Sequence, residues 1–179
     1  MNRLAITVAM MTGAVALSAC DQKEMATGAP VAGGASATAT LATAAGAPAG
    51  TATATEVAGG IRFTASITGA TPGTHGIHIH TTGRCDGPDF QTAGGHWNPT
   101  MMKHGTMNPQ GPHEGDLPNI VIGNDGRGTV GVTIPGATIA GLLDADGSAI
   151  VLHAGPDDLK TDPAGNSGGR IACGVFAAS

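Results

Sequence analysis

Residues 82–115 place the tightest limit on what this chain can fold into, because the stretch is long, polar and without helical or strand periodicity. It is rich in Gly, Pro and His and contains few large apolar residues. A loop of this length is uncommon inside a compact domain unless a function fixes its conformation. We therefore expect something other than a hydrophobic core to hold this segment in place.

Strand patterns lie on both sides of the long loop, and glycine-rich turns separate them. Apolar and polar residues alternate in residues 61–67, and Asn124-Asp125-Gly126 is a strong turn signal. The 30 glycines and the lack of a convincing amphipathic helix favour an all-β sandwich or barrel, with a second long loop at 154–169. The predicted strands, about eight in number, are 35–43, 50–57, 61–67, 76–81, 119–122, 128–134, 148–153 and 170–176, and 70–74 is predicted as a turn.

The seven histidines all lie between positions 75 and 153. His78 and His80 flank Ile79 in a predicted strand, so their imidazoles emerge on the same face. Two nitrogens on a rigid strand form half of a nitrogen-rich square site, which suits copper(II). A His-x-His pair by itself is weak evidence, since surface pairs that bind nothing are common.

The long loop carries a second group of possible ligands, namely His96, His104, His113 and Asp116. Three imidazoles and one carboxylate are enough for a closed tetrahedral zinc site. Metal binding could then order the loop, because binding and folding share one free energy where no site pre-exists. The alternative is a set of solvated loop histidines. Spacing alone predicts a metalloprotein and no particular activity.

Several segments, in the same order along the chain, resemble the copper–zinc superoxide dismutase family. The resemblance covers roughly residue 35 to the C-terminus. It implies a Greek-key β-sandwich or barrel, an architecture for which this family is itself a known example. The matching segments are GIHIH (76–80), AGGHWNP (93–99), KHG (103–105), HEGDL (113–117), VLH (151–153), DDL (157–159) and GNSGGRIACGV (165–175).

The resemblance also implies a role for each matching residue. His96 would bridge copper and zinc as an imidazolate, and Arg170 would attract and orient a superoxide anion beside copper. Asp157 would accept hydrogen bonds from one copper and one zinc histidine, and His75 would brace the site without binding metal. The implied copper ligands are His78, His80, His96 and His153, and the implied zinc ligands are His96, His104, His113 and Asp116.

The implied activity is dismutation of superoxide to oxygen and hydrogen peroxide, with copper and zinc as cofactors and His96 as a proton donor. The alternative is a non-enzymatic copper or zinc carrier with a dismutase-like fold, which would need neither a bridging His96 nor Arg170. The net charge of −5 argues against sequence-independent binding to nucleic acid. We expect a monomer or a homodimer.

The N-terminus resembles a bacterial lipoprotein signal. Residues 4–17 are largely apolar but too few for an ordinary membrane span, and Leu17-Ser18-Ala19-Cys20 resembles a lipobox. We therefore expect a signal peptide at 1–19, a lipidated Cys20 with a flexible tether through residue 34, and a folded domain at 35–179. The alternative is a simple secretory signal that leaves Cys20 as a free thiol. The expected location is the periplasmic side of the bacterial cell envelope, with the lipid in the membrane.

Export also bears on the three cysteines. If Cys20 carries lipid, Cys85 and Cys173 remain as the internal pair, and the family resemblance implies a disulfide between them. An exported protein stands in a compartment where such a bond can persist. The bridge would tie the metal loop to the last long strand.

Overall fold

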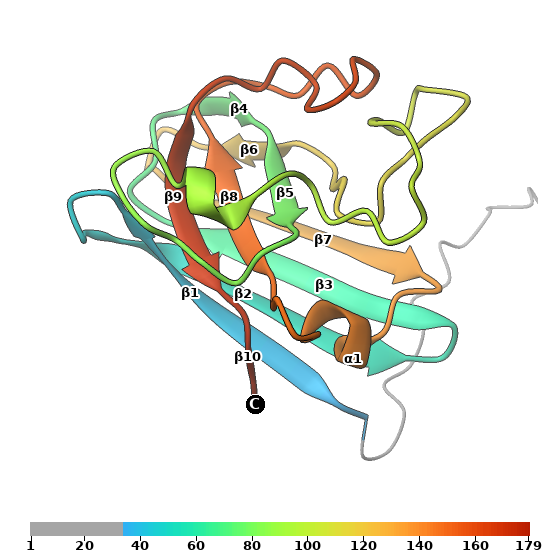
Figure 1. The fold of residues 1–179 in the computed structure, drawn as a ribbon. Helices are drawn as coiled ribbons and strands as arrows, with labels where there is room; N and C mark the ends of the chain where they lie inside the picture. The colour runs from blue at the N-terminus through green and yellow to red at the C-terminus, as the bar shows by residue number, and fades with distance from the viewer. Residues whose placement is uncertain (1–33) are drawn as a thin grey trace, which may run out of the picture.

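The computed structural model describes residues 34–179. The predictions for the signal peptide at 1–19, for Cys20 and for nearly all of the tether lie outside the described residues. Within them, the predicted all-β class is confirmed, because antiparallel strands dominate the fold (Figure 1). Most of these strands form one curled sheet with the order β5-β8-β9-β1-β2-β3-β7, and β10 pairs with β1. The strands of this sheet are β1 (Ser36–Thr43), β2 (Pro48–Val57), β3 (Gly60–Ile67), β5 (Ile77–His80), β7 (Gly128–Pro135), β8 (Ala149–His153), β9 (Arg170–Val175) and β10 (Ala177–Ala178).

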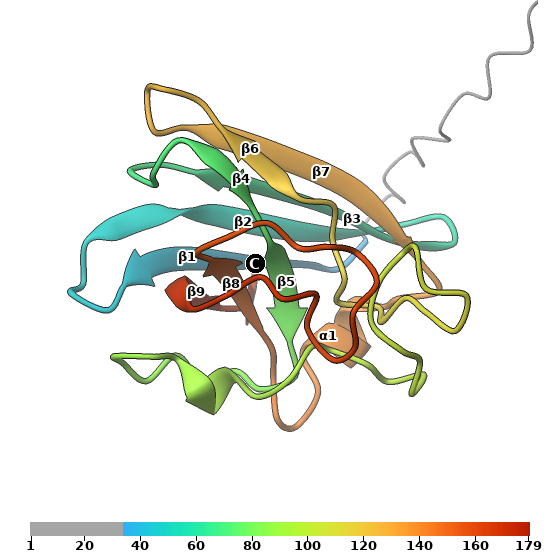
Figure 2. The same cartoon turned by 90° about the horizontal axis from the view of Figure 1, so that it is seen from above.

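A small second sheet joins the two ends of the large one. It pairs β4 (Gly73–His75) with β6 (Ile120–Ile122). β4 leads directly into β5, and β6 leads through the turn at 123–127 into β7. β5 and β7 are the two edge strands of the large sheet, which curls into a half-barrel. The small sheet lies between these two edges and partly closes the barrel (Figure 2).

The prediction of a turn over 70–74 is wrong at its C-terminal end, since Gly73 and Thr74 belong to β4. Three residues are too few to show a periodic pattern. Their partner strand β6 lies more than forty residues further along the chain, so the pairing leaves no local signal. The two-residue strand β10 was not predicted either, for the same reason.

The alternation seen in the sequence decides which face of the sheet is buried. In β1, β2 and β3 the paired residues Ala39, Ala52 and Ala65 are buried, whereas Thr38 and Thr53 are exposed. Successive side chains of a strand point to opposite faces, so a threonine–alanine alternation gives one wetted and one buried face. The buried face lines the main core, which also contains Phe63, Trp97, Leu142 and Phe176.

Within residues 34–179, two one-turn helices complete the fold, namely η1 (Gln91–Ala93) and α1 (Ile139–Leu142). The sequence showed no convincing helix, and both are too short to create a helical pattern. Thr138 caps α1, because its Oγ1 accepts a hydrogen bond from the Gly141 amide at 3.0 Å. Across residues 34–179, helices that combine the length and the apolar character needed to cross a membrane are absent.

Candidate metal centre

The pairing of β5 with β8 brings histidines from both strands to the same face. His78 lies opposite Val151, and His80 lies opposite Ala149. Residues that pair directly in an antiparallel sheet share a face, and residue 153 is two positions beyond Val151. The imidazoles of His78, His80 and His153 therefore project from the same face of the sheet. The opposite face of β5 buries Ile77 and Ile79 in the main core.

The free edge of β5 is lined by two segments of the long loop. The amide of Trp97 donates to the Ile79 carbonyl at 2.8 Å, and the amide of Ile79 donates to the Gly115 carbonyl at 3.0 Å. These hydrogen bonds place His96 opposite His80 and Asp116 opposite His78, as isolated bridges. The rigid strand thus fixes two loop residues that the loop could not place alone.

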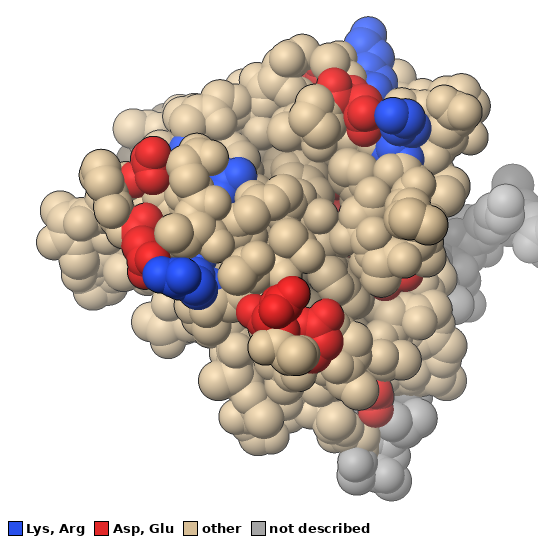
Figure 3. All heavy atoms as spheres, viewed as in Figure 1, with Lys and Arg blue, Asp and Glu red and all other residues tan. Residues whose placement is uncertain are grey.

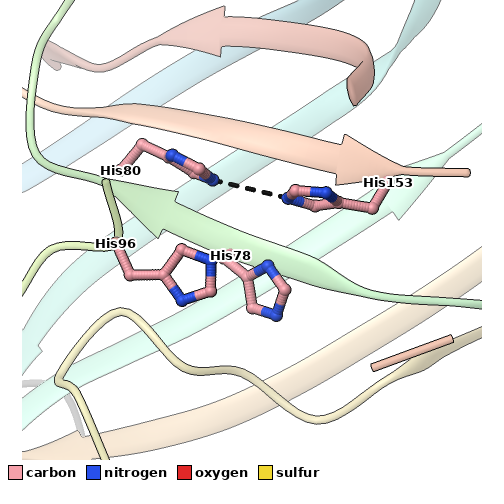
Figure 4. A group of neighbouring side chains, drawn as sticks. All are labelled: His78, His80, His96 and His153. Carbon is pink, nitrogen blue, oxygen red and sulfur yellow. Dashed lines mark hydrogen bonds between the residues drawn. The ribbon is translucent and has the colours of Figure 1, made fainter. Parts of the chain in front are cut away.

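Four histidines form the first cluster (Figure 4), with one ligand nitrogen from each lying within 4.8 Å of the others. The Nε2 atoms of His80 and His153 are 3.4 Å apart, and their Nδ1 atoms lie 2.9 and 3.2 Å from the carbonyls of Gly94 and Gly168. The Nδ1 atom of His78 and the Nε2 atom of His96 are buried without a hydrogen-bond partner. Buried polar atoms are rarely left unpaired, so this cluster fits a bound cation. Its nitrogen-only donor set suits copper.

The second cluster is built around the Asp116 carboxylate. Its Oδ1 atom lies 2.8, 3.0 and 3.2 Å from the Nδ1 atoms of His96, His104 and His113. The amides of Gly105 and His113 donate to Oδ2 at 2.8 and 3.0 Å, which fixes the carboxylate. Three nitrogens and one oxygen are the donor set of a closed zinc site. His96 belongs to both clusters, with Nδ1 toward Asp116 and Nε2 toward the other histidines.

Asp157 connects the two clusters from behind. Its Oδ2 atom lies 2.7 Å from Nε2 of His78, and its Oδ1 atom lies 3.0 Å from Nε2 of His104. Each of these imidazoles has its Nδ1 atom directed at a cluster and its Nε2 atom at the carboxylate. An outer carboxylate of this kind fixes the orientation of the ring and its tautomer.

His75 lies outside both clusters. Its Nδ1 atom is 2.8 Å from the carbonyl of His153, and its Nε2 atom is 2.9 Å from the carbonyl of Thr71. The side chain is buried and spans from β4 to the end of β8. It therefore supports the backbone of one cluster histidine.

Burial and neighbouring groups set the protonation of the clusters. Burial lowers the pKa of His96 to about 4 and that of His153 to about 3, and it also lowers the pKa of His80. These rings are neutral at pH 7, which is the form that binds metal. Burial opposes the proton on His104 as well, but hydrogen bonds to Asp116 and Asp157 raise its pKa to about 9. The metal-free site thus holds a proton on His104 between two carboxylates, and a cation would displace it.

The predicted disulfide is confirmed, since Cys85 and Cys173 are bonded with their Cα atoms 5.7 Å apart. It ties the segment 85–94 to β9, and the Arg170 guanidinium reaches the same segment. Its Nη1 atom donates to the Phe90 carbonyl at 2.8 Å, and its Nη2 atom donates to the Gly94 carbonyl at 2.7 Å. A pocket of about 280 Å³ has both His153 and Arg170 in its wall.

The two long loops lie side by side over the metal clusters. The Met107 amide donates to the Leu159 carbonyl at 2.8 Å, and Asp162 accepts from the His104 amide at 2.9 Å. On the face seen in Figure 3, Lys and Arg side chains lie beside Asp and Glu and do not form one extended positive patch.

A curled antiparallel barrel with two histidine clusters that share one imidazole defines a binuclear metalloprotein. The chain belongs to the copper/zinc superoxide dismutase family, whose family model matches residues 48–176. The family and the two donor sets together assign copper and zinc as its metals.

Individual relatives agree with this assignment. The chain is 52% identical over 104 residues to a copper–zinc superoxide dismutase of Aquifex aeolicus. The aligned region covers 55% of this chain and 62% of that protein. The chain thus spans less than two thirds of the length of that relative. Among solved structures, a superoxide dismutase-like protein from Bacillus subtilis has a TM-score of 0.73 and 37% identity, covering 77% of this chain and 96% of that one. The copper–zinc enzyme from Brucella abortus has a TM-score of 0.64 and 30% identity, covering 78% and 98%.

Sequence reasoning missed three supporting groups. The carbonyls of Phe90 and Gly94 hold Arg170, and Asn119 bonds to the backbone of Asp157. Backbone carbonyls carry no residue-specific signal, so the first two could not be found from the sequence. Asn119 stood within a predicted strand, and only the fold brings it to Asp157.

Proposed function

We propose that this chain dismutates superoxide, converting two superoxide anions and two protons into oxygen and hydrogen peroxide. The observation that carries the proposal is the position of His96, whose two ring nitrogens face two different clusters. A site that only stored metal would have no need for one imidazole shared between two unlike donor sets. Copper would supply the electron exchange, since it alternates between two oxidation states, whereas zinc has no redox chemistry.

Arg170 supplies the attraction for the substrate. Its guanidinium is half-buried beside His153, in the wall of the same pocket, and both of its terminal nitrogens are anchored by carbonyls. A guanidinium stays charged at neutral pH, so it favours an anion and disfavours neutral molecules. Two anchored nitrogens hold the charge in one direction, which orients the anion toward the four-histidine cluster.

His96 supplies a proton to the reduced product. Because its Nδ1 atom faces Asp116, the ring can stay in place at the zinc side while Nε2 holds or releases a proton. The proton held at Nε2 would then pass to the peroxide anion, which is a strong base.

The experiment is the decay of superoxide in the presence of protein loaded with copper and zinc, followed by pulse radiolysis. We expect fast decay with the unaltered protein, a drop of at least about tenfold for Arg170→Ala, and a large loss for His96→Ala. A carrier with the same fold would bind both metals in full and leave the decay rate unchanged. Full activity of His96→Ala would contradict the proton role.

We also propose that the protein is anchored by lipid on Cys20 at the periplasmic side of the cell envelope, as a monomer or homodimer. The lipobox-like residues 17–20 support this location. The Cys85–Cys173 disulfide supports it as well, because such bonds persist in oxidising compartments. A Cys20→Ser variant should leave the membrane fraction and appear among soluble exported proteins. Retention of that variant in the membrane would contradict the anchor.

A further inference from the structure

The direction of the Arg170 guanidinium depends on the backbone of one short loop segment. Its two terminal nitrogens donate to the carbonyls of Phe90 and Gly94, four residues apart. Gly94 is shared with the metal cluster, since its carbonyl also lies 2.9 Å from Nδ1 of His80. Phe90 has no such link to the cluster, so something else must fix its carbonyl.

The side chain of Phe90 is what fastens this segment to the barrel. Asp86 to Asp89 and Gln91 are exposed, whereas Phe90 is only 4% exposed. Its ring packs in a small cluster that is separate from the main core. This small cluster contains both cysteines of the disulfide. The other members of this cluster are Cys85, Ala93, Ala149, Val151 and Cys173.

The backbone of Phe90 has an unusual conformation that couples the ring to the carbonyl. Its φ angle is 56°, in the left-handed region that bulky residues seldom adopt. In this conformation the ring packs in the disulfide cluster while the carbonyl accepts hydrogen bonds from Arg170 and, at 3.1 Å, from the Ala93 amide. Loss of the buried ring would remove the packing that holds the residue in this strained conformation.

We infer that Phe90 is a positioning residue for substrate binding, and that its buried ring fixes the Arg170 guanidinium through the Phe90 carbonyl. The inference rests on the proposed function in one respect, namely that Arg170 binds the anionic substrate. It adds a specific dependence: the strength of anion binding is set in part by an apolar side chain that touches neither the metals nor the anion.

The test uses azide, a small monovalent anion, titrated into full-length protein loaded with copper and zinc and followed by the copper absorption band. Arg170→Ala defines the full effect of losing the guanidinium. Phe90→Ala should weaken azide binding roughly tenfold, the scale of one charge-assisted hydrogen bond. Adding Phe90→Ala to Arg170→Ala should weaken binding little further, because Phe90 acts only through the guanidinium.

The matched pair Phe90→Leu and Phe63→Leu separates positioning from general stability. Phe63 is fully buried in the main core, on β3, so the same change there lowers the melting temperature without touching the disulfide cluster. We expect weaker azide binding for Phe90→Leu and unchanged binding for Phe63→Leu, both measured well below the melting temperature. The leucine variant also keeps the test usable if Phe90→Ala does not fold.

Three results would overturn the inference. The first is azide binding in Phe90→Leu that equals the unaltered protein, and the second is full additivity of the Phe90 and Arg170 changes. The third is azide binding that does not depend on Arg170 at all. Failure of the proposed function looks different, because the loaded protein would then leave superoxide decay unchanged while azide binding still depended on Phe90.

Discussion

Asn119 holds the backbone of Asp157 from both sides. Its Oδ1 atom accepts a hydrogen bond from the Asp157 amide at 2.8 Å, and its Nδ2 atom donates to the Asp157 carbonyl at 2.8 Å. Asp157 in turn contacts one histidine of each metal cluster. Asn119 lies three residues after Asp116, immediately before β6. Asn119 therefore joins the segment that contains Asp116, the carboxylate of the second cluster, to the loop that contains Asp157.

Replacing Asn119 with alanine should weaken zinc retention roughly tenfold, the lower end of what loss of an outer-sphere partner costs. Without the two hydrogen bonds, Asp157 is held less firmly against His104. Competition with a zinc chelator measures the effect. Asn124→Ala, in the exposed turn between β6 and β7, is the control and should retain zinc normally. Equal zinc retention in the two variants would show that Asn119 does not support the site.

Replacing both Cys85 and Cys173 with serine should destabilise the metal-free protein by about 2–5 kcal/mol. The bridge spans a sequence separation of 88 residues, so its loss frees a long loop in the unfolded chain. Urea unfolding of the two proteins under the same conditions gives the difference. A loss below about 1 kcal/mol would contradict this expectation, because it would mean that the bridge hardly restrains the unfolded chain.

The metal-free protein should lose stability as the pH falls from 6.5 toward 4. The folded-state pKa values of His96 and His153 are lowered to about 4 and about 3. In this window the unfolded chain binds protons at these residues and the folded chain does not, so the free energy of unfolding falls with pH. His104, with its pKa raised to about 9, is protonated in the folded state throughout this window and opposes the loss only slightly, near pH 6.5, where the unfolded histidine is half protonated.

The expected loss between pH 6.5 and pH 4 is about 2 kcal/mol or more. Urea unfolding at several pH values, with a chelator present, measures it. Full loading with copper and zinc should remove most of this dependence down to the pH at which the metals leave, because bound metal excludes the proton. A flat profile for the metal-free protein would contradict the assigned burial of these histidines.

Replacing His75 with alanine should destabilise the protein by about 1–3 kcal/mol, because it leaves the buried carbonyl of His153 without the His75 imidazole and also removes the contact with the more exposed carbonyl of Thr71. His75→Gln can donate to one of these carbonyls and should lose less. Thermal unfolding gives the order of the three proteins, and metal analysis should show one copper and one zinc in each. Loss of a metal from His75→Ala would show that this histidine does more than brace the backbone.

The sequence alone determined the all-β architecture and the residue types that form the site. Threonine–alanine and apolar–polar alternation is a local property with a period of two residues, so β1, β2 and β3 could be found from it. The spacing of His78 and His80 placed both rings on one face of a strand for the same reason. The order of the family-like segments then indicated which loop residues accompany them.

Only the tertiary structure decided how these groups face one another. The pairing of β4 with β6, the bonds from Asn119 to Asp157 and the position of the Phe90 ring all join residues that are far apart along the chain. Whether Nδ1 or Nε2 of a ring points at a cluster depends on which carbonyl or carboxylate lies behind it. Such contacts depend on chain closure over long distances, and no local pattern of residues encodes them.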